Sequence, residues 1–99
     1  MRVIDHEPWS WFLLASGDDA LLDVHVDQGP FGGSLLICLT AAERESLDRE
    51  GRAYAIRLAR EIQNSAPLHI ASTSPYRARD LTGTLGDQVT RAVAAWRKE

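Results

Sequence analysis

Three short apolar runs, joined by short connections rich in glycine, constrain the fold of this chain more than any other feature. They span residues 9–16, 20–27 and 33–39 and follow an irregular start over residues 1–8. The first connection is a Gly/Asp turn of the hairpin kind, and the second is a longer loop in which Pro30 fixes a bend. Because connections this short join antiparallel neighbours, the sequence predicts an antiparallel meander.

Alternation along these strands assigns each side chain to one of two faces of the sheet. When Val26 is paired with Leu35, one face is apolar throughout and becomes the expected core. Its members are Trp9, Trp11, Leu13, Leu22, Val24, Val26, Leu35, Ile37 and Leu39. The reverse face mixes apolar side chains with an acidic row on the middle strand. It carries Ser10, Phe12, Leu14, Asp23, His25, Asp27, Leu36 and Cys38.

A long helix follows the strands. Thr40 with Glu43 three residues later forms a capping box at its start, and Pro67 cannot continue it. Small and apolar residues at helical spacing form its buried stripe, in which Gly51 is expected to allow close packing. Residues 65–86 form a long connection, within which 68–72 can add an edge strand. A short helix over 87–99 closes the chain.

These elements predict one domain over residues 1–99 of the α+β class. We expect a two-layer sandwich: an antiparallel meander of three to four strands, followed by a long helix and a short C-terminal helix. With both helices on the core face, Phe12, Leu14 and Leu36 form an apolar patch on the reverse face. That patch is explained by a partner, by a homodimer, or by residues 65–86 folding across it.

The composition is that of an ordinary globular domain, with 44% hydrophobic and 25% charged residues. A net charge of −3 argues against nucleic-acid binding, and no apolar run is long enough to span a bilayer. The single cysteine, Cys38, excludes an internal disulfide and fits a reducing compartment. The start of the chain does not resemble a signal peptide, so we expect a cytoplasmic protein without membrane partners.

The charges are unevenly distributed along the chain. Residues 1–51 contain ten acidic and three basic residues, whereas residues 52–99 contain four acidic and eight basic ones. One interpretation is that folding brings the two halves together and neutralises both. The other is that an acidic face remains available to a basic partner.

The row of Asp23, His25 and Asp27 is the sharpest candidate for a chemical site. Two carboxylates and an imidazole can hold a divalent metal, or one carboxylate can orient His25 as a general base. The alternative is the polar side of a half-exposed strand, which we favour because three residues in line converge poorly on a metal. Cys38 is better explained as a small buried residue than as a catalytic thiol. We therefore expect neither a metal nor a cofactor.

Several segments together resemble a known group of proteins. They are "HEPWSWFLL" (6–14), "LDV" (22–24), "DREGRAYAIRLAREI" (48–62) and "NSAP" (64–67). In these segments the chain resembles small bacterial α+β proteins similar to the immunity proteins that accompany polymorphic toxins. The resemblance implies an α+β fold and a protein partner, and it assigns no catalytic residue.

The sequence therefore predicts a protein-interaction module, an immunity-type inhibitor that binds a basic partner through an acidic and aromatic surface. The residues expected at that surface are Phe12, Asp18, Asp19, Asp23, His25 and Asp27. The alternative function is a small metal-dependent or hydrolytic enzyme that uses Asp23, His25 and Asp27.

Overall fold

The computed structural model describes residues 1–26, 33–67 and 72–98 of the chain. At its centre is a four-stranded antiparallel sheet in which consecutive strands are neighbours. The strands are β1 (Arg2–Glu7), β2 (Trp11–Ser16), β3 (Asp19–Val26) and β4 (Gly33–Cys38). The predicted antiparallel meander is confirmed, and it has four strands.

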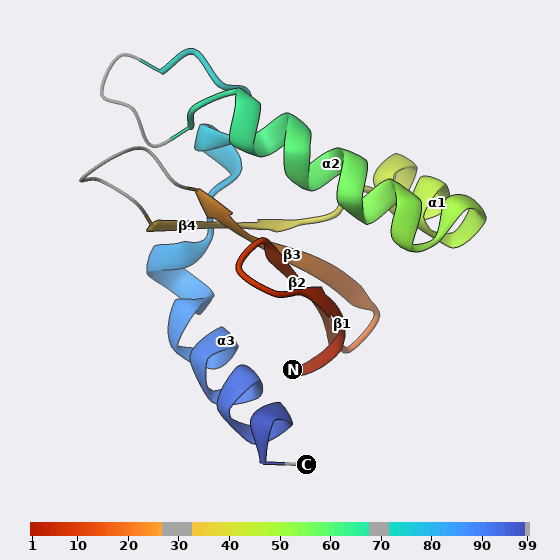
Figure 1. Ribbon diagram of the computed structural model, residues 1–99, viewed down its shortest axis with the longest axis vertical. Coiled ribbons are helices and arrows are strands. Elements are labelled where there is room, and N and C mark those ends of the chain that lie inside the picture. The colour runs from red at the N-terminus through yellow and green to blue at the C-terminus, as the bar shows by residue number, and fades with distance from the viewer. Residues whose placement is uncertain (27–32, 68–71, 99) are drawn as a thin grey trace.

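Helices cover both faces of the sheet. The helices are α1 (Ala41–Glu50), α2 (Arg52–Asn64) and α3 (Thr82–Arg97), with the short 3-10 helix η2 (Arg77–Arg79) before α3. α1 and α2 lie on one side of the sheet and α3 lies on the other (Figure 1). The α+β class is confirmed, but the molecule has three layers where the sequence predicts two. No helix in the described residues is long and apolar enough to cross a membrane.

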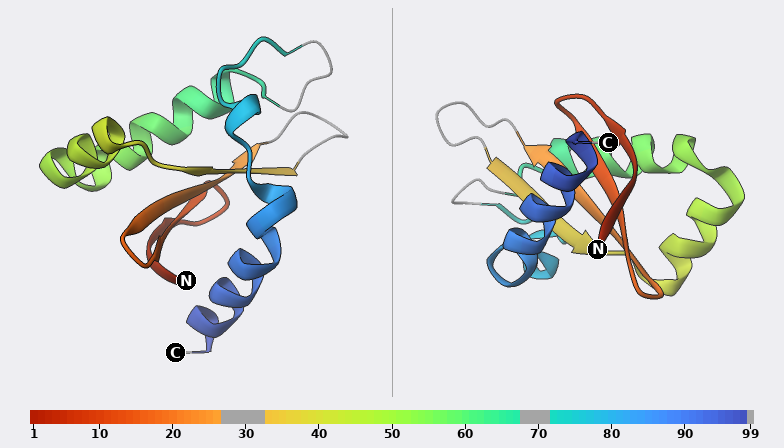
Figure 2. Two further views of the ribbon diagram at one scale, coloured as in Figure 1. Left: turned by 180° about the vertical axis from the view of Figure 1, so that it is seen from behind. Right: turned by 90° about the horizontal axis from the view of Figure 1, so that it is seen from below.

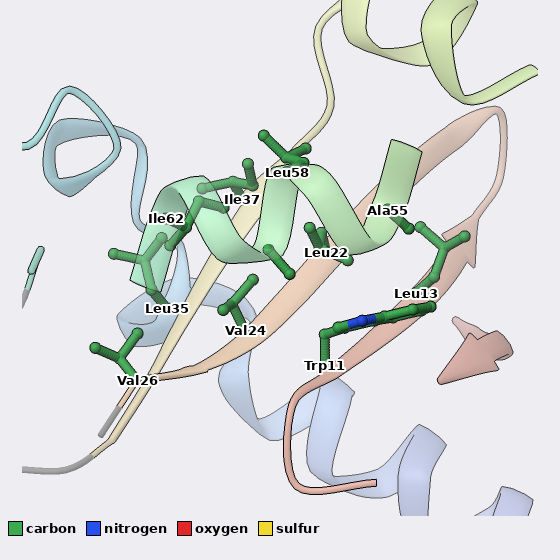
Figure 3. Close-up of a cluster of buried hydrophobic side chains, with 11 residues drawn as sticks. Trp11, Leu13, Leu22, Val24, Val26, Leu35, Ile37, Ala55, Leu58 and Ile62 are labelled. Atoms are coloured by element: carbon green, nitrogen blue, oxygen red, sulfur yellow. The ribbon is translucent and has the colours of Figure 1, made fainter. Parts of the chain in front are cut away.

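The main core fills the space between α2 and one face of the sheet (Figure 3). Its strand members are Trp11, Leu13, Leu22, Val24, Val26, Leu35 and Ile37, and α2 adds Ala55, Leu58, Ala59 and Ile62. Leu39 is partly buried against the same cluster. Strand alternation turns these side chains to one face, so the predicted core face is confirmed for all its strand residues except Trp9.

A second core lies between the reverse face of the sheet and α3. Leu14, Leu21 and Leu36 are at most 2% exposed there, and they pack with Val89 and Ala92 of α3. α3 crosses the sheet from β4 to β1 and therefore covers the apolar patch with the chain's own residues (Figure 2). The prediction of a homodimer whose reverse sheet faces pack together is therefore wrong, because α3 of the same chain already buries these side chains.

The predicted long helix is two helices, separated at Gly51. The predicted capping box is present at the start of α1: the Glu43 N–H donates to Thr40 Oγ1 at 3.2 Å, and the Thr40 N–H donates to Glu43 Oε1 at 2.8 Å. Gly51 has a φ of 65°, a conformation that favours glycine, and the chain turns there. A Cβ at this glycine would meet nothing within 4 Å. Gly51 thus serves the turn, and the prediction of close packing is wrong.

The register between β3 and β4 is two residues away from the predicted one. Val24 pairs with Leu35, a residue that the sequence analysis pairs with Val26. A slip by an even number of residues keeps every side chain on its face, so the faces are right although the pairs are not. As a result Cys38 pairs with Leu21.

β1 forms from the segment that looks irregular in the sequence. A β-bulge between Val3 and Asp5 breaks the alternation, and Ile4 at the bulge is 47% exposed. The outer edge of this strand is partly occupied. Arg52 donates from Nη1 to the carbonyl oxygen of His6 at 2.9 Å and forms an ion pair with Asp5.

Residues 79–82 bind the outer edge of β4 in place of a fifth strand. The Leu81 N–H donates to the carbonyl oxygen of Leu36 at 2.7 Å, and the Leu36 N–H donates to Asp80 Oδ1 at 3.1 Å. The same carboxylate oxygen accepts from the Thr82 N–H at 3.0 Å, at the first residue of α3. Asp80 therefore fixes the start of α3 to the middle of β4. The predicted edge strand over 68–72 falls largely on residues 68–71, outside the described residues.

Candidate functional site

A hollow opens where the turn between β1 and β2 lies beside the end of β3. Its volume is about 370 Å³. Its lining includes the aromatic and imidazole rings of His6, Trp9, Trp11, Phe12, His25 and Trp96. We call this cavity the Trp9 hollow. Its walls come from β1, β2 and the last turn of α3, so the two termini of the chain contribute to one site.

Trp9 stands at the rim of the hollow with 92% of its surface exposed. Its φ is 65°, which is uncommon for a residue with a side chain. The turn is closed by a hydrogen bond from the Ser10 N–H to the Glu7 carbonyl oxygen at 3.0 Å, and Glu7 Oε2 accepts from the Trp11 indole N–H at 3.1 Å. The prediction of Trp9 as a core residue is wrong, because this turn interrupts strand alternation before β2 begins.

Three rings form the wall beside Trp9. The His6 ring stacks on that of Phe12, with centroids 5.6 Å apart. Trp96 meets both rings edge to face, with centroid distances of 4.4 Å to His6 and 5.6 Å to Phe12. Because these contacts join β1, β2 and α3, the shape of the wall is fixed by the fold.

Asp23 lies on the floor of the hollow and supplies the only carboxylate among its described lining residues. Within β3 it has Phe12 and Leu36 as cross-strand neighbours, so its surroundings are largely apolar. Burial raises the pKa of Asp23 to about 6; the negative charge of Asp80 adds to this rise and His25 opposes it. In the described part of the chain, no hydrogen bond or ion pair reaches the Asp23 carboxylate.

His25 and Ser34 complete the polar part of the floor. They pair across β3 and β4, and the side chain of His25 is exposed. The backbone of His25 is held on both sides: its N–H donates to the Ser10 carbonyl oxygen at 2.8 Å, and its carbonyl accepts from Gln63 Nε2 at 3.0 Å. The imidazole is thus free to meet a ligand while its backbone is fixed.

A second hollow of about 300 Å³ continues from the same floor along α3. It shares Asp23 and Ser34 with the Trp9 hollow. Its helix side is built from small residues, among them Thr82, Gly86 and Thr90. A Cβ at Gly86 would meet only the Thr82 methyl group, at 3.6 Å. Asp23 therefore faces open space on both sides.

Of the six residues selected from the sequence, the structure brings together Phe12, Asp23 and His25. Asp18 and Asp19 are exposed at the turn between β2 and β3, at the opposite end of the sheet. At about 3.3 Å per residue, roughly 20 Å of strand separates Asp19 from His25. Asp27 lies outside the described residues.

Sequence reasoning missed the three rings that shape the hollow together with Phe12. It placed Trp9 in the core and selected neither His6 nor Trp96 for the site. Pro8 was the one available signal for Trp9, because proline favours a turn at this point. Nothing in the spacing of the sequence links Trp96 to His6.

The enzymatic alternatives use Asp23, His25 and Asp27, and the structure describes the first two of these residues. In the described residues, no three His, Cys, Asp or Glu side chains are grouped to hold a metal ion. Asp23 and His25 occupy alternate positions of β3, roughly 7 Å apart, and no hydrogen bond joins their described side chains. Cys38 lies about four residues along β4 from Ser34, the partner of His25. Burial and then the charge of Asp19 raise the pKa of its thiol, which disfavours a thiolate.

Comparisons of this chain with protein-family models, with curated proteins and with solved structures give no match.

Proposed function

We propose that this chain is a cytoplasmic protein-interaction module that binds a basic protein through the rim of the Trp9 hollow, as an immunity-type inhibitor would. The observation that carries the proposal is the indole of Trp9, 92% exposed on a turn held at a φ of 65°. Exposed tryptophans at the edge of a concave site are typical anchors of protein interfaces.

The size of the indole makes it an effective anchor. A buried aromatic side chain removes about 150–250 Å² from water, which at about 25 cal/mol per Å² gives on the order of 5 kcal/mol before the costs of association. The neighbouring rings of His6, Phe12 and Trp96 are already packed against one another. A partner that covers Trp9 therefore meets a preformed surface and loses little free energy in ordering it.

The charge of the same end of the molecule favours a basic partner. Several acidic residues are neutralised internally: Asp5 pairs with Arg52, Glu43 with Arg79, and Glu50 with Arg57. By contrast, Glu7 and Asp23 take part in no ion pair within the described residues. The acidic excess of residues 1–51 is therefore only partly neutralised by these ion pairs, and Glu7 and Asp23 are its unpaired members at the Trp9 end of the sheet.

The test compares Trp9→Ala with Ile4→Ser. Ile4 and Trp9 are the two large hydrophobic residues exposed in the described part of the chain, and Ile4 does not line the hollow. Each variant and the wild type are used to capture proteins from extracts of the source cells. A protein that depends on Trp9 is then purified, and its affinity for all three forms is measured by calorimetry at low and high salt.

We expect a basic protein that binds the wild type and Ile4→Ser equally and binds Trp9→Ala at least roughly 30-fold more weakly, the effect of an interface hot spot of about 2 kcal/mol. Its affinity is expected to fall as salt is added, because salt screens the attraction between opposite charges. The proposal fails if Trp9→Ala binds every captured protein as tightly as the wild type, or if the Trp9-dependent protein is acidic.

A further inference from the structure

We infer that the Trp9 hollow receives the guanidinium group of an arginine from the partner, with the Asp23 carboxylate as its counter-ion and the rim indole against its flat face. The inference rests on the proposed function and names the side chain that the partner inserts. It is carried by three features of the hollow: an unpaired carboxylate on the floor, aromatic rings on the walls, and room for a single side chain.

The first feature is the state of Asp23. Its side chain is half-buried between Phe12 and Leu36, and no described cation or donor contacts its carboxylate. A carboxylate in such surroundings is destabilised in its charged form, in keeping with its raised pKa. A guanidinium group placed in the hollow supplies both a positive charge and a pair of donors matched to a carboxylate.

The second feature is the aromatic wall. Guanidinium groups are weakly hydrated and stack on aromatic faces more readily than ammonium groups do. The described residues already make three such contacts: Arg52 lies 5.0 Å from the Trp11 ring centroid, Arg57 lies 5.1 Å from that of Tyr54, and Arg79 lies 6.0 Å from that of Tyr76. The exposed ring of Trp9 has no arginine over it in the described residues, so its face is available.

The third feature is the size of the site. A volume of about 370 Å³ lies at the small end of ligand pockets, which suits one inserted side chain and excludes a helix or a folded segment. The neighbouring hollow adds hydroxyl groups, since Thr82 and Thr90 line it and Ser34 is shared by both. These hydroxyl groups lie along the hollow that continues from Asp23.

The charged groups that face Asp23 come from several elements. They are His25 of β3, His6 of β1, Asp80 before α3, and Asp87 and Arg97 of α3. Asp80 and Asp87 favour an incoming cation. Arg97 opposes it, but Arg97 is exposed on the last turn of α3 and forms no described ion pair, so water screens its charge. The test is made above about pH 7, where Asp23, with a pKa of about 6, is ionised.

The experiment titrates the isotope-labelled protein with blocked arginine, N-acetyl-arginine N-methylamide, and follows the indole N–H signals of Trp9 and Trp96 by NMR. The matched ligand control is the same derivative of citrulline, which has nearly the same shape and no charge. Blocked lysine tests whether a compact ammonium group suffices. The variants are Asp23→Asn and, as a charge-matched control, Glu45→Gln on the exposed side of α1.

We expect saturable shifts with arginine, roughly tenfold weaker binding of citrulline and of lysine, and a similar loss for arginine with Asp23→Asn. Glu45→Gln is expected to bind arginine as the wild type does. The inference is overturned if citrulline or lysine binds as tightly as arginine, or if Asp23→Asn leaves arginine binding unchanged.

The two proposals fail in different ways. If the Trp9-dependent partner binds Asp23→Asn with full affinity, the arginine inference is wrong and the proposed function stands. If no protein depends on Trp9 although blocked arginine binds in an Asp23-dependent manner, the proposed function is wrong and the hollow is a site for a smaller cationic ligand.

Discussion

Replacement of Asp23 by asparagine should stabilise the folded protein at neutral pH. Asparagine has nearly the same shape as aspartate and carries no charge, so it keeps the packing between Phe12 and Leu36 and removes the desolvated carboxylate. A substitution that stabilises the fold and weakens binding would show that this carboxylate is kept for a reason other than folding.

The magnitude follows from the pKa of Asp23, which folding raises from 3.8 to about 6. Because the folded form holds the proton more tightly, ionisation destabilises it. Well below pH 3.8 the group is protonated in the folded and the unfolded chain, and it costs nothing. Between about pH 4 and pH 6 the unfolded chain releases the proton while the folded chain retains it, so the folded protein loses stability, and above about pH 6 the loss is complete. About two pKa units at 1.36 kcal/mol each give a penalty of up to about 3 kcal/mol at about pH 7.5.

The assay is urea unfolding followed by far-UV circular dichroism at several values between about pH 4 and pH 7.5. The quantity compared is the free energy of unfolding of Asp23→Asn minus that of the wild type, so that all other titrating groups cancel. We expect a difference of about 0.5 kcal/mol at the acidic end that grows to about 1.5–3 kcal/mol at the neutral end. Glu45→Gln, which removes the same charge at an exposed position, is measured as the matched control.

A difference that is constant with pH would refute the reasoning, because it would mean that Asp23 titrates alike in the folded and the unfolded chain. A difference that falls with pH would also refute it. In that case the folded protein would stabilise the ionised carboxylate, and a partner cation would not offset a free-energy cost of burying it.

Two further substitutions test the packing and the helix start. Leu14→Ala leaves a cavity at a fully buried position beneath α3 and should lower the free energy of unfolding by about 2–5 kcal/mol in the same urea assay. A loss below about 1 kcal/mol would mean that α3 does not pack firmly on the sheet. Thr40→Ala removes the acceptor of the Glu43 N–H and should cost about 1 kcal/mol, whereas Thr40→Ser should restore most of it; equal stability of all three would contradict the capping box.

The sequence was sufficient for those features that depend on local alternation. The faces of β2, β3 and β4 and the start of α1 follow from strand parity and from one capping motif, which are decided within a few residues. The strand register could not be predicted in this way, because a slip by two residues leaves the faces unchanged. In the same way, Gly51 in a helical stripe gives no sign that its φ is positive.

The site was harder to predict because it is assembled from distant parts of the chain. Phe12, Asp23 and His25 share a face of the sheet, so parity placed them together. Trp96 reaches His6 only because α3 crosses the reverse face, and that crossing depends on the contacts of residues 79–82 with β4. Long-range contacts of this kind leave no periodic pattern in a single sequence. The turn at Trp9 is indicated only by the preceding residue, Pro8.

The segment over residues 79–82 both covers the outer edge of β4 and holds the start of α3 in place. It occupies carbonyl oxygens along the edge of β4: Thr82 Oγ1 donates to Ser34, the Leu81 N–H to Leu36, and Arg79 Nη2 to Cys38. It also leads directly into α3. A substitution that detaches the segment from β4 therefore exposes the second core and the edge of β4 at the same time. Strand edges and bare apolar faces are what drive aggregation. Partial unfolding at this end should therefore lead to precipitation rather than to a soluble, binding-defective protein, and damaging substitutions in the segment would lower the amount of protein before they lower its affinity.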